Sequence, residues 1–447
     1  MAPKMSVSVK RPARIQGSID APSDKSISHR AAIFNALASG SSEIQNFSAS
    51  ADCMSTLRCL RSLGARITAT QTNPAPQNYT KTLKITGFGA TGIREPENVL
   101  NAGNSGTTMR LLMGMLAANE INSVLTGDHS LRSRPMIREI RALRQMGAQI
   151  WSRGDRSLPP ISVKGEYLSG GHYTMPEASA QLKSTLLIAG LFSKQAITID
   201  QPHISRDHSE RMLAAMGASI TSNELQITIQ PGQIQATDMR VPGDISSASF
   251  WLVLGLCHPE SEITVRNVNI NPSRAGFLQV IERMGGSIRI TNQTTQSGEP
   301  VADLTATSSS LSGTTIEGAM IPLLIDELPI LALAACFAKG QTQIKDASSL
   351  RVKETDRITT TTTELTRMGA QIKETTDGMI VTGIKSLYGT TTSSHGDHRL
   401  AMTLGIAGML ADGETEIAYP GSTRISYPGF WDDLQVIAPG ILDSNAN

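Results

Sequence analysis

The chain has 447 residues, which is too many for one ordinary hydrophobic core, so two or three domains are expected. Its formal net charge is only +1, which argues against a nucleic-acid polymer or an anionic membrane surface as the main partner. Hydrophobic residues make up 39% and aromatic residues 4% of the chain, so the core of this globular protein must consist mainly of aliphatic residues, Ala and Met.

The four cysteines contain no C-x-x-C pair and none lies near a histidine cluster. We therefore expect neither a metal site nor a disulfide framework, and a reducing cytoplasm fits this pattern. The basic N-terminal stretch lacks the apolar segment of a signal peptide, and no run of 18 apolar residues occurs. The sequence accordingly predicts no secretion signal and no membrane span.

Six helices that are apolar nearly all round recur along the chain, and a short strand follows each of them. The helices are expected over residues 28–41, 107–118, 181–193, 247–257, 327–338 and 399–411. The strands are expected to begin near Glu43, Asn122, Ala196, Glu262, Gln341 and Glu414. Helices without a polar face belong in a core, so these six should be buried.

A second pattern recurs five times: the end of an amphipathic helix, a glycine, and then a β-branched residue that opens a strand. A glycine at this point supplies the left-handed backbone conformation that ends a helix. The five glycines are Gly64, Gly147, Gly217, Gly285 and Gly369. Together the two patterns divide the chain into six related units, the sixth lacking the second pattern, and three units in each of two domains is the natural grouping.

The connections between these units also carry predictions. The segment Val241–Asp244 lies between the third and fourth units and is interpreted as a crossing point between domains. Residues 71–80 and 291–312 are polar and are interpreted as surface loops, the second being the more flexible. The threonine run Thr359–Thr363 is expected to be helical, because the apolar residues around it have helical spacing.

Four of the buried helices begin with a capping residue next to a cation. These starts are Ser23–Arg30, Asn104–Arg110, Ser179–Lys183 and Gly396–Arg399. The free N–H groups and the dipole of a helix start attract anions, and a nearby Lys or Arg strengthens this attraction. For any single start, capping alone is the simpler interpretation. Four such starts together favour an anion-binding site.

Two further features are ambiguous by themselves. The segment Arg351–Arg357 carries three cations and two acids, which is typical either of a solvated helix face or of an anion site. Asp326 precedes a buried helix and is either an N-cap or a catalytic acid or base. Glu354 is either a salt-bridged surface residue or a group that transfers a proton.

At this point the residues point to a family. The motifs that carry the resemblance are Asp24–Arg30, Gly103–Arg110, Arg134–Met136, Asp244–Ala248, Arg351–Arg357 and Asp397–Arg399. Found in this order over nearly the whole chain, they resemble the EPSP synthase family. The resemblance implies an α/β fold: a two-domain inside-out α/β barrel built from six βαβαββ repeats, the enolpyruvyl transferase fold. It also implies an upper domain over residues 24–243 and a lower domain over residues 1–23 plus 244–447, joined by a two-strand hinge.

The resemblance further implies a reaction of the chorismate pathway, which serves aromatic amino acid biosynthesis. In it the enolpyruvyl group of phosphoenolpyruvate moves to the 5-hydroxyl of shikimate 3-phosphate, and phosphate is released. The residues implied for shikimate 3-phosphate are Lys25, Ser26, Arg30, Ser179, Gln181, Ser205, Asp326 and Lys353. Those implied for phosphoenolpyruvate are Lys25, Gly106, Arg134, Gln181, Arg357 and Arg399. Asp326 is expected to take the hydroxyl proton and Glu354 to act as acid and then base, and Lys25 is the third residue expected to be catalytic.

Both substrates are anions, and planar arginines fit carboxylate and phosphate oxygens. Phosphate is a leaving group by its own chemistry, so no metal and no cofactor is expected. By the resemblance the protein is a cytoplasmic monomer without nucleic-acid or membrane partners. Two alternatives remain open: a UDP-N-acetylglucosamine enolpyruvyl transferase, although the segment Gly127–Pro135 lacks the cysteine usual there, and a non-catalytic phosphate-binding protein.

Overall fold

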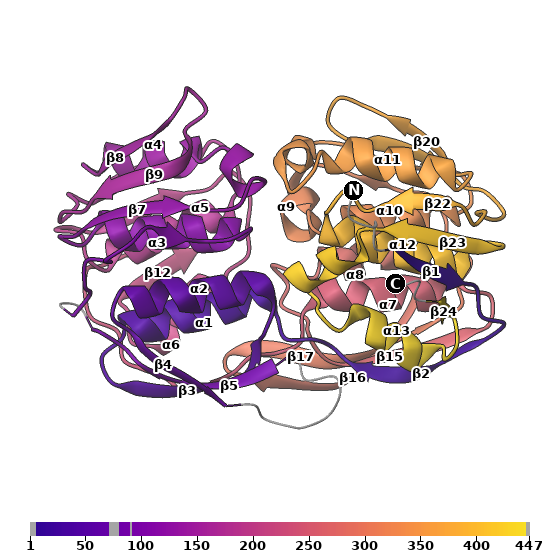
Figure 1. The fold of residues 1–447 in the computed structure, drawn as a ribbon, viewed down its shortest axis with the longest axis horizontal. Helices are drawn as coiled ribbons and strands as arrows, with labels where there is room; N and C mark the ends of the chain where they lie inside the picture. Colours follow the sequence, from indigo (N-terminus) through magenta and orange to yellow (C-terminus); the bar gives the residue numbers. More distant parts are fainter. Residues whose placement is uncertain (1–5, 71–79, 90–91, 444–447) are drawn as a thin grey trace. The chain divides into compact units, whose positions relative to one another are not determined.

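The computed structural model describes residues 6–70, 80–89 and 92–443, and it divides into two compact units (Figure 1). Unit 1 consists of the described residues within Met1–Pro22, Pro242–Thr295 and Pro300–Asn447. Unit 2 consists of those within Ser23–Val241 together with the short segment Gln296–Glu299. The described residues form six four-stranded sheets, three in each unit.

One sheet of unit 2 shows the repeat in its simplest form. In chain order it contains β6 (Leu100–Asn101), α3 (Gly106–Ala117), β7 (Asn122–Thr126), α4 (Ile137–Gln145), β8 (Gln149–Arg153) and β9 (Leu158–Lys164). The strand order is β6-β7-β9-β8, in which β6 is parallel to β7 while β9 is antiparallel to β7 and β8. This is a βαβαββ unit, in which each helix connects two strands of the same sheet.

The other two sheets of unit 2 have the same order. The first contains β10 (Gly171–Thr174), α5 (Ala180–Gly190), β11 (Ile197–Asp200), α6 (His208–Ala215), β12 (Ile220–Asn223) and β13 (Gln226–Ile229). The second contains α1 (Lys25–Leu37), β3 (Ser41–Ser48), α2 (Ala51–Ser62), β4 (Arg66–Thr70) and β5 (Thr80–Thr86). Its opening strand is β14 (Met239–Arg240), which comes almost 200 residues later in the chain and pairs in parallel with β3.

Unit 1 repeats this architecture. One sheet contains β18 (Thr315–Ile316), α9 (Ile321–Leu324), α10 (Leu328–Cys336), β19 (Gln341–Ile344), α11 (Arg357–Arg367), β20 (Gln371–Glu374) and β21 (Met379–Thr382). A second contains α7 (Ile245–Cys257), β15 (Ser261–Asn269), α8 (Gly276–Arg283), β16 (Ser287–Gln296) and β17 (Glu299–Thr307), and it is opened by β2 (Ile15–Asp20), parallel to β15. The N-terminal strand β2 and the late strand β14 therefore each complete the sheet of a distant segment.

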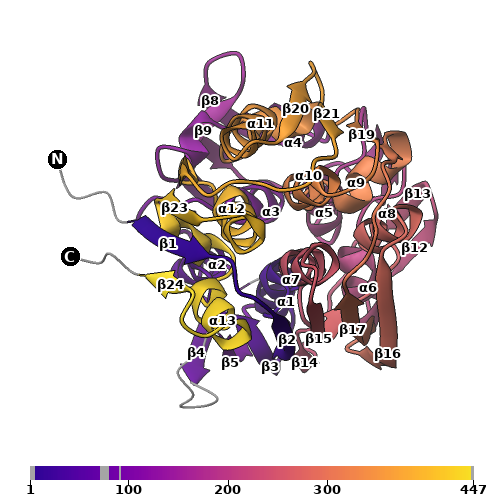
Figure 2. The same ribbon diagram turned by 90° about the vertical axis from the view of Figure 1, so that its right-hand side faces the viewer.

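The third sheet of unit 1 takes its fourth strand from the N-terminal segment. It contains β22 (Thr391–Ser393), α12 (His398–Leu410), β23 (Glu414–Ala418), α13 (Phe430–Ile437) and β24 (Leu442–Asp443). The strand β1 (Ser6–Lys10) lies between β23 and β24 and is antiparallel to both (Figure 2). This borrowed strand explains why the sixth unit lacks the helix–glycine–strand pattern of the other five.

The six helices expected to be buried are α1, α3, α5, α7, α10 and α12, and their ends agree with the prediction to within four residues. Nearly every residue of these helices is buried, so they form the cores of the two units. The five predicted helix-ending glycines all have positive φ, between 80° and 106°. Both sequence patterns are therefore confirmed.

The prediction of a flexible loop over residues 291–312 is wrong. Residues 287–296 and 299–307 form the neighbouring strands β16 and β17. Almost every side chain of β16 is exposed, so this strand lacks the apolar alternation by which strands are recognised. The turn between the strands belongs to unit 2, where Glu299 lies 2.8 Å from Nδ1 of His208, and both side chains are buried.

Two further predictions concern the threonine run Thr359–Thr363 and the loop expected at residues 71–80. The threonine run is helical, as expected, and lies within α11, whose start is capped by the carboxylate of Asp356. Of the expected loop at 71–80, residues 71–79 lie outside the described residues and Thr80 begins β5. Within the described residues, no single helix is long and apolar enough to cross a membrane, and only the bent pair Gly318–Leu324 with Leu328–Cys336 reaches that length and composition.

Aromatic side chains hold α13 against α7 in unit 1. The ring centroids of Trp251 and Phe430 lie 5.3 Å apart, and those of Tyr427 and Phe430 lie 5.7 Å apart. The Tyr427 hydroxyl donates to Oδ2 of Asp433 at 2.6 Å and accepts from Nε1 of Trp251 at 3.1 Å. Burial raises the pKa of the Asp433 carboxyl to about 6, although the Tyr427 hydrogen bond acts against this rise.

This raised pKa predicts how stability depends on pH. The folded protein binds the Asp433 proton more tightly than the unfolded chain does, so this stabilisation is complete below about pH 4 and is lost as the pH rises through about 6. We expect Asp433→Asn to raise the free energy of unfolding by on the order of 2 kcal/mol at pH 8 and to change it little at pH 4. Thermal unfolding at several pH values measures this difference. Asp432→Asn is the exposed control, and an equal effect of both substitutions at every pH would contradict the prediction.

Candidate functional site

The four predicted helix starts are all capped by their own side chains. Asp24 accepts from the Ile27 N–H, Ser105 from that of Thr108, Ser179 from that of Leu182, and Asp397 from that of Arg399, at distances between 2.8 and 3.3 Å. Capping is therefore real at each start. Capping does not explain the cations next to these helix starts, and their role depends on the groups around them.

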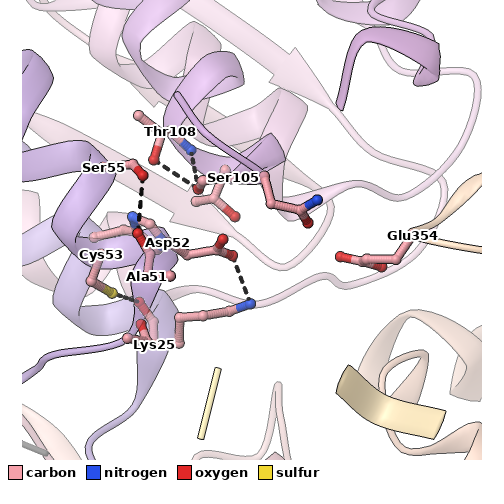
Figure 3. Close-up of polar contacts among 12 residues, drawn as sticks. Lys25, Ala51, Asp52, Cys53, Ser55, Ser105, Thr108 and Glu354 are labelled. Atoms are coloured by element: carbon pink, nitrogen blue, oxygen red, sulfur yellow. Dashed lines mark hydrogen bonds and ion pairs between the residues drawn. The ribbon is translucent and has the colours of Figure 1, made fainter. Parts of the chain in front are cut away.

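Lys25, the first residue of α1, is held by an acid of the next helix. Its Nζ lies 3.0 Å from Oδ2 of Asp52 in the first turn of α2 (Figure 3). The side chain of Asp52 is only 6% exposed, whereas that of Lys25 is 15% exposed. The same figure shows Thr108 turned toward Ser105 at the start of α3. The ammonium group is thus fixed at the start of α1 while part of it stays accessible.

Arg30 places a buried positive charge one turn further along α1. The side chain donates to the hydroxyls of Ser209 and Ser184, both at 2.8 Å, and to the carbonyl of Ser26 at 3.0 Å. Burial, with a smaller contribution from Arg206, lowers the pKa of Arg30 to about 10, so the group is still protonated at neutral pH. A buried cation held mainly by neutral groups favours a nearby anion.

Behind Arg30, a buried ion pair holds the loop that carries Ser205. Nζ of Lys183 lies 2.6 Å from Glu210 and donates to the Ser205 carbonyl at 3.2 Å. The Ser205 hydroxyl, itself buried, donates to Oε1 of Gln201 at 2.7 Å. These contacts connect the start of α6 to α5 and fix the backbone of Ser205.

The starts of α3 and α5 meet around Gly106. Gln181 donates to the Thr107 hydroxyl at 2.9 Å and accepts from Arg110 at 3.3 Å. Arg134 donates to Oδ1 of Asn104 at 2.9 Å. A Cβ atom at Gly106 would lie 2.7 Å from Nη1 of Arg110 and 3.5 Å from Nη1 of Arg134. Two guanidinium groups therefore crowd the position that glycine leaves open.

In unit 1, Arg357 is the centre of a cluster of acids. Its guanidinium is 2% exposed and lies 2.8 Å from Asp397, 2.6 Å from Glu354 and 3.7 Å from Asp326. Burial opposes its charge, but the three acids outweigh burial and raise the pKa of Arg357 above its usual value. The segment Arg351–Arg357 is therefore no solvated helix face at its C-terminal end.

The two predicted catalytic acids, Asp326 and Glu354, form ion pairs with Arg357 and remain partly accessible to solvent. The side chain of Asp326 is 19% exposed and that of Glu354 is 13% exposed, whereas that of Asp397 is fully buried. Asp326 is not the N-cap residue of α10: that position belongs to Glu327, whose side chain makes no capping hydrogen bond. Arg357 thus brings Asp326 and Glu354 to one place from two segments of unit 1.

The remaining residues of the segment Arg351–Arg357 have different environments. Arg351 bonds to Asp356 at 2.8 Å and to Glu374 at 2.9 Å, and Asp356 caps α11, so both stabilise the local fold. Lys353 lies between them, partly exposed, at the end of the 3-10 helix Ser348–Val352. Arg399, the second residue of α12, is only 4% exposed. Among the described residues, its Nε and Nη1 atoms have no hydrogen-bond partner, so two buried donors can bind an anion.

Sequence reasoning missed several residues that hold these groups in place. They are Asp52 beside Lys25, Glu139 beside Arg110 and Glu210 beside Lys183. Asp52 and Glu139 lie in the first turns of helices, where an acid is common for reasons of the helix dipole alone. Their partners come from other helices, so only the packed structure identifies their roles. The described residues hold no group of three or more His, Cys, Asp or Glu side chains able to bind a metal ion.

Known proteins match this chain over almost its full length. The EPSP synthase structure of Acinetobacter baumannii superposes with a TM-score of 0.84 at 36% identity and covers 98% of this chain and 99% of that one. The α/β enolpyruvyl transferase fold expected from the sequence is thereby confirmed.

The sequence comparisons agree with the fold. Residues 9–434 match the family EPSP synthase (3-phosphoshikimate 1-carboxyvinyltransferase). The 3-phosphoshikimate 1-carboxyvinyltransferase of Roseiflexus sp. strain RS-1 is 49% identical over 439 residues, which is 97% of this chain and 99% of the relative. That of Chloroflexus aurantiacus is 49% identical over 436 residues, 96% of this chain and 98% of the relative. The chain belongs to the EPSP synthase family, as its motifs predicted.

Arg357 gives a test of the acid cluster. Arg357→Met leaves three acids around an apolar side chain, one of them fully buried, so we expect a loss of about 3–5 kcal/mol in the free energy of unfolding. Arg351→Met is the matched control: its arginine is more exposed, and its loss should cost about 1 kcal/mol. Chemical denaturation measures both. Equal losses for the two variants would show that the cluster has no special role in the fold.

Proposed function

We propose that this protein transfers the enolpyruvyl group of phosphoenolpyruvate to the 5-hydroxyl of shikimate 3-phosphate, giving 5-enolpyruvylshikimate 3-phosphate and phosphate. The observation that carries the proposal is the Arg357 cluster, in which two partly exposed carboxylates share one buried cation. A protein that only bound anions would gain nothing from acids at that point. Membership of the EPSP synthase family supports the choice of substrates.

Shikimate 3-phosphate is assigned to residues around Arg30. Its phosphate is proposed to bind the cation of Arg30, with Lys25, Ser26, Ser179 and Ser205 as hydrogen-bonding partners. Arg30 suits this role because it is a buried cation whose own hydrogen bonds go to neutral groups. Three groups complete the proposed set for this substrate, namely Gln181, Lys353 and Asp326.

Phosphoenolpyruvate carries both a phosphate and a carboxylate, and planar guanidinium groups fit each of them. We assign it to Lys25, Gly106, Arg134, Gln181, Arg357 and Arg399. Arg399 is suited to it by the two buried donors that no described residue uses. Gly106 is suited to it because the adjacent Arg110 and Arg134 leave room for little more than backbone there.

The chemistry requires two proton transfers. The 5-hydroxyl oxygen forms a bond to C2 of phosphoenolpyruvate while Asp326 accepts the hydroxyl proton and Glu354 donates a proton to C3, which becomes a methyl group. In the second step the bond from C2 to the phosphate oxygen breaks, phosphate leaves, and Glu354 takes a proton back from C3. The cation of Arg357 between the two carboxylates fits these roles, because it stabilises whichever of them is ionised.

The less specific features of the protein are proposed by analogy with its family. We propose that it acts as a monomer in the cytoplasm on these two small molecules, and without a metal or cofactor.

Phosphate release tests the substrate assignment. With phosphoenolpyruvate present, shikimate 3-phosphate should support steady release of phosphate, whereas UDP-N-acetylglucosamine should not. If phosphate were released with UDP-N-acetylglucosamine but not with shikimate 3-phosphate, the protein would be a UDP-N-acetylglucosamine enolpyruvyl transferase. Binding of both anions without any release would identify a phosphate-binding protein.

Asp326 tests the assignment of the base. We expect Asp326→Ala to lower kcat by roughly a hundredfold or more, in line with the loss of general-base catalysis, and to change KM for phosphoenolpyruvate much less. Asp155→Ala, in the exposed turn between β8 and β9, is the control and should leave turnover unchanged. Turnover of Asp326→Ala equal to that of the control would remove Asp326 from the mechanism.

A further inference from the structure

A buried ion pair lies directly beside the proposed base. Glu327 follows Asp326 in the chain and is completely buried, and Arg274, in the turn before α8, is 2% exposed. Nη1 of Arg274 donates to both carboxylate oxygens of Glu327, at 3.1 and 3.2 Å. None of the roles assigned above uses this pair.

The pair also reaches the start of α7. Nη2 of Arg274 donates to the Ser246 hydroxyl, which in turn donates to Oε1 of Glu327. The same nitrogen lies 3.5 Å from Asp244, the residue that caps α7 by accepting from the Ser246 N–H at 2.8 Å. Arg274 therefore connects the starts of two buried helices, α7 and α10. Asp244 also lies only two residues after Pro242, where the chain enters unit 1 for the second time.

Stability alone does not explain such a pair. Taking two charges out of water costs about as much as their attraction returns, and an apolar pair of similar volume is often at least as stable. A buried ion pair does, however, fix the direction of the groups that carry it, because both partners need their hydrogen bonds to be satisfied. The question is therefore which group near Glu327 requires a fixed direction.

That group is Asp326, because of the backbone on which it lies. Asp326 and Glu327 lie at the corner between α9 and α10, where the chain bends by 108° between the helical segment Gly318–Leu324 and α10. Two successive side chains point in different directions at such a corner: Glu327 toward Arg274 in the core, and Asp326 toward Arg357. Because the two residues are joined by a planar peptide bond, holding Glu327 in place limits the positions that the Asp326 backbone can take.

The other side of the corner is packed as tightly. A Cβ atom at Gly276, the first residue of α8, would lie 2.9 Å from Cβ of Leu323 and 3.2 Å from the carbonyl carbon of Leu323. The backbone that follows Arg274 thus lies against α9, the segment that leads into Asp326. Both arms of the corner are therefore held by the same short segment around Arg274.

We propose that Arg274 and Glu327 are positioning residues for the reaction: they hold Asp326 in its catalytic direction and keep the net charge behind it close to zero. The proposal rests on the function proposed above, in which Asp326 accepts the hydroxyl proton. Neither residue touches substrate in this account. They act through the backbone and through their charges.

The charges make the proposal testable by pH. Asp326 is faced by Arg357 from α11, by Glu354 from the segment before it and, through Arg357, by Asp397 from α12; behind it lie Glu327 and Arg274, with Asp244 beyond. Glu327→Gln leaves the Arg274 cation uncancelled, which favours ionised Asp326 and moves the acid limb of the kcat profile to lower pH. Arg274→Met leaves the Glu327 anion uncancelled and moves that limb to higher pH.

The experiment measures kcat and both KM values from about pH 5 to about pH 9 for the full-length wild-type protein and five variants of it. We expect opposite shifts of the acid limb of roughly half a unit to one unit for Glu327→Gln and Arg274→Met. The double variant, which is neutral, should return the limb to its wild-type position. All three should lose roughly ten- to a hundredfold in kcat, with KM values within about threefold, because the direction of Asp326 is relaxed.

Arg274→Lys separates charge from direction. It keeps the cation but loses the planar guanidinium, whose two nitrogens donate to Glu327 and to Ser246, so the limb should stay in place while kcat falls. Together with the double variant it also carries the test if a single charge-removing variant fails to fold. Glu364→Gln, which removes another fully buried carboxylate of unit 1, is the matched control and should leave the acid limb unchanged.

The outcomes distinguish this inference from the proposed function. If the wild-type protein released no phosphate with shikimate 3-phosphate, the function itself would fail. If the wild-type protein is active, shifts in the same direction for both single variants, or unchanged kcat in Arg274→Lys and the double variant, would overturn the positioning role and leave the function standing.

Discussion

The buried guanidinium of Arg357 is the interaction on which unit 1 most depends. Three carboxylates from three segments meet at this one cation: Asp397 at the start of α12, Glu354 just before α11, and Asp326 at the corner between α9 and α10. Without the cation their mutual repulsion and burial would keep these segments apart. The same arrangement keeps two of these acids partly exposed beside the cation, so the interaction that stabilises the fold also holds the groups proposed for proton transfer.

The repeated architecture provides the conditions for this arrangement. Each βαβαββ unit places the start of one buried helix after a strand of its sheet, and these starts carry Lys25, Arg30 and Arg399, three of the cations proposed to bind the substrates. The helices approach closely because their residues are small. A Cβ atom at Gly114 of α3, for example, would lie 2.2 Å from the Thr185 carbonyl of α5. Such close packing holds Gln181 against Thr107 and Arg110, and it leaves little freedom to the side chains at the helix starts.

Much of the fold could be predicted from the sequence because its signals are local. The apolar helices and the helix-ending glycines follow from periodicity and from backbone conformation, and both patterns agree with the structure. The mistaken loop at 291–312 shows the limit of such signals. The strand β16 is exposed along nearly its whole length, so its hydrogen bonds to β17, and not its own side chains, make it a strand.

The candidate site also has features that the sequence predicts and features that only the structure shows. The sequence by itself determined which residues carry charge and where helices begin, and the order of its motifs identified the family, because these depend on residue type and spacing. Only the tertiary structure decided that Arg357 is buried while Arg351 is partly exposed, that Glu327 and not Asp326 is the N-cap residue of α10, and that Asp52 pairs with Lys25 and Glu327 with Arg274. These properties depend on burial and on partners distant in the chain, and neither is encoded in a local stretch of residues.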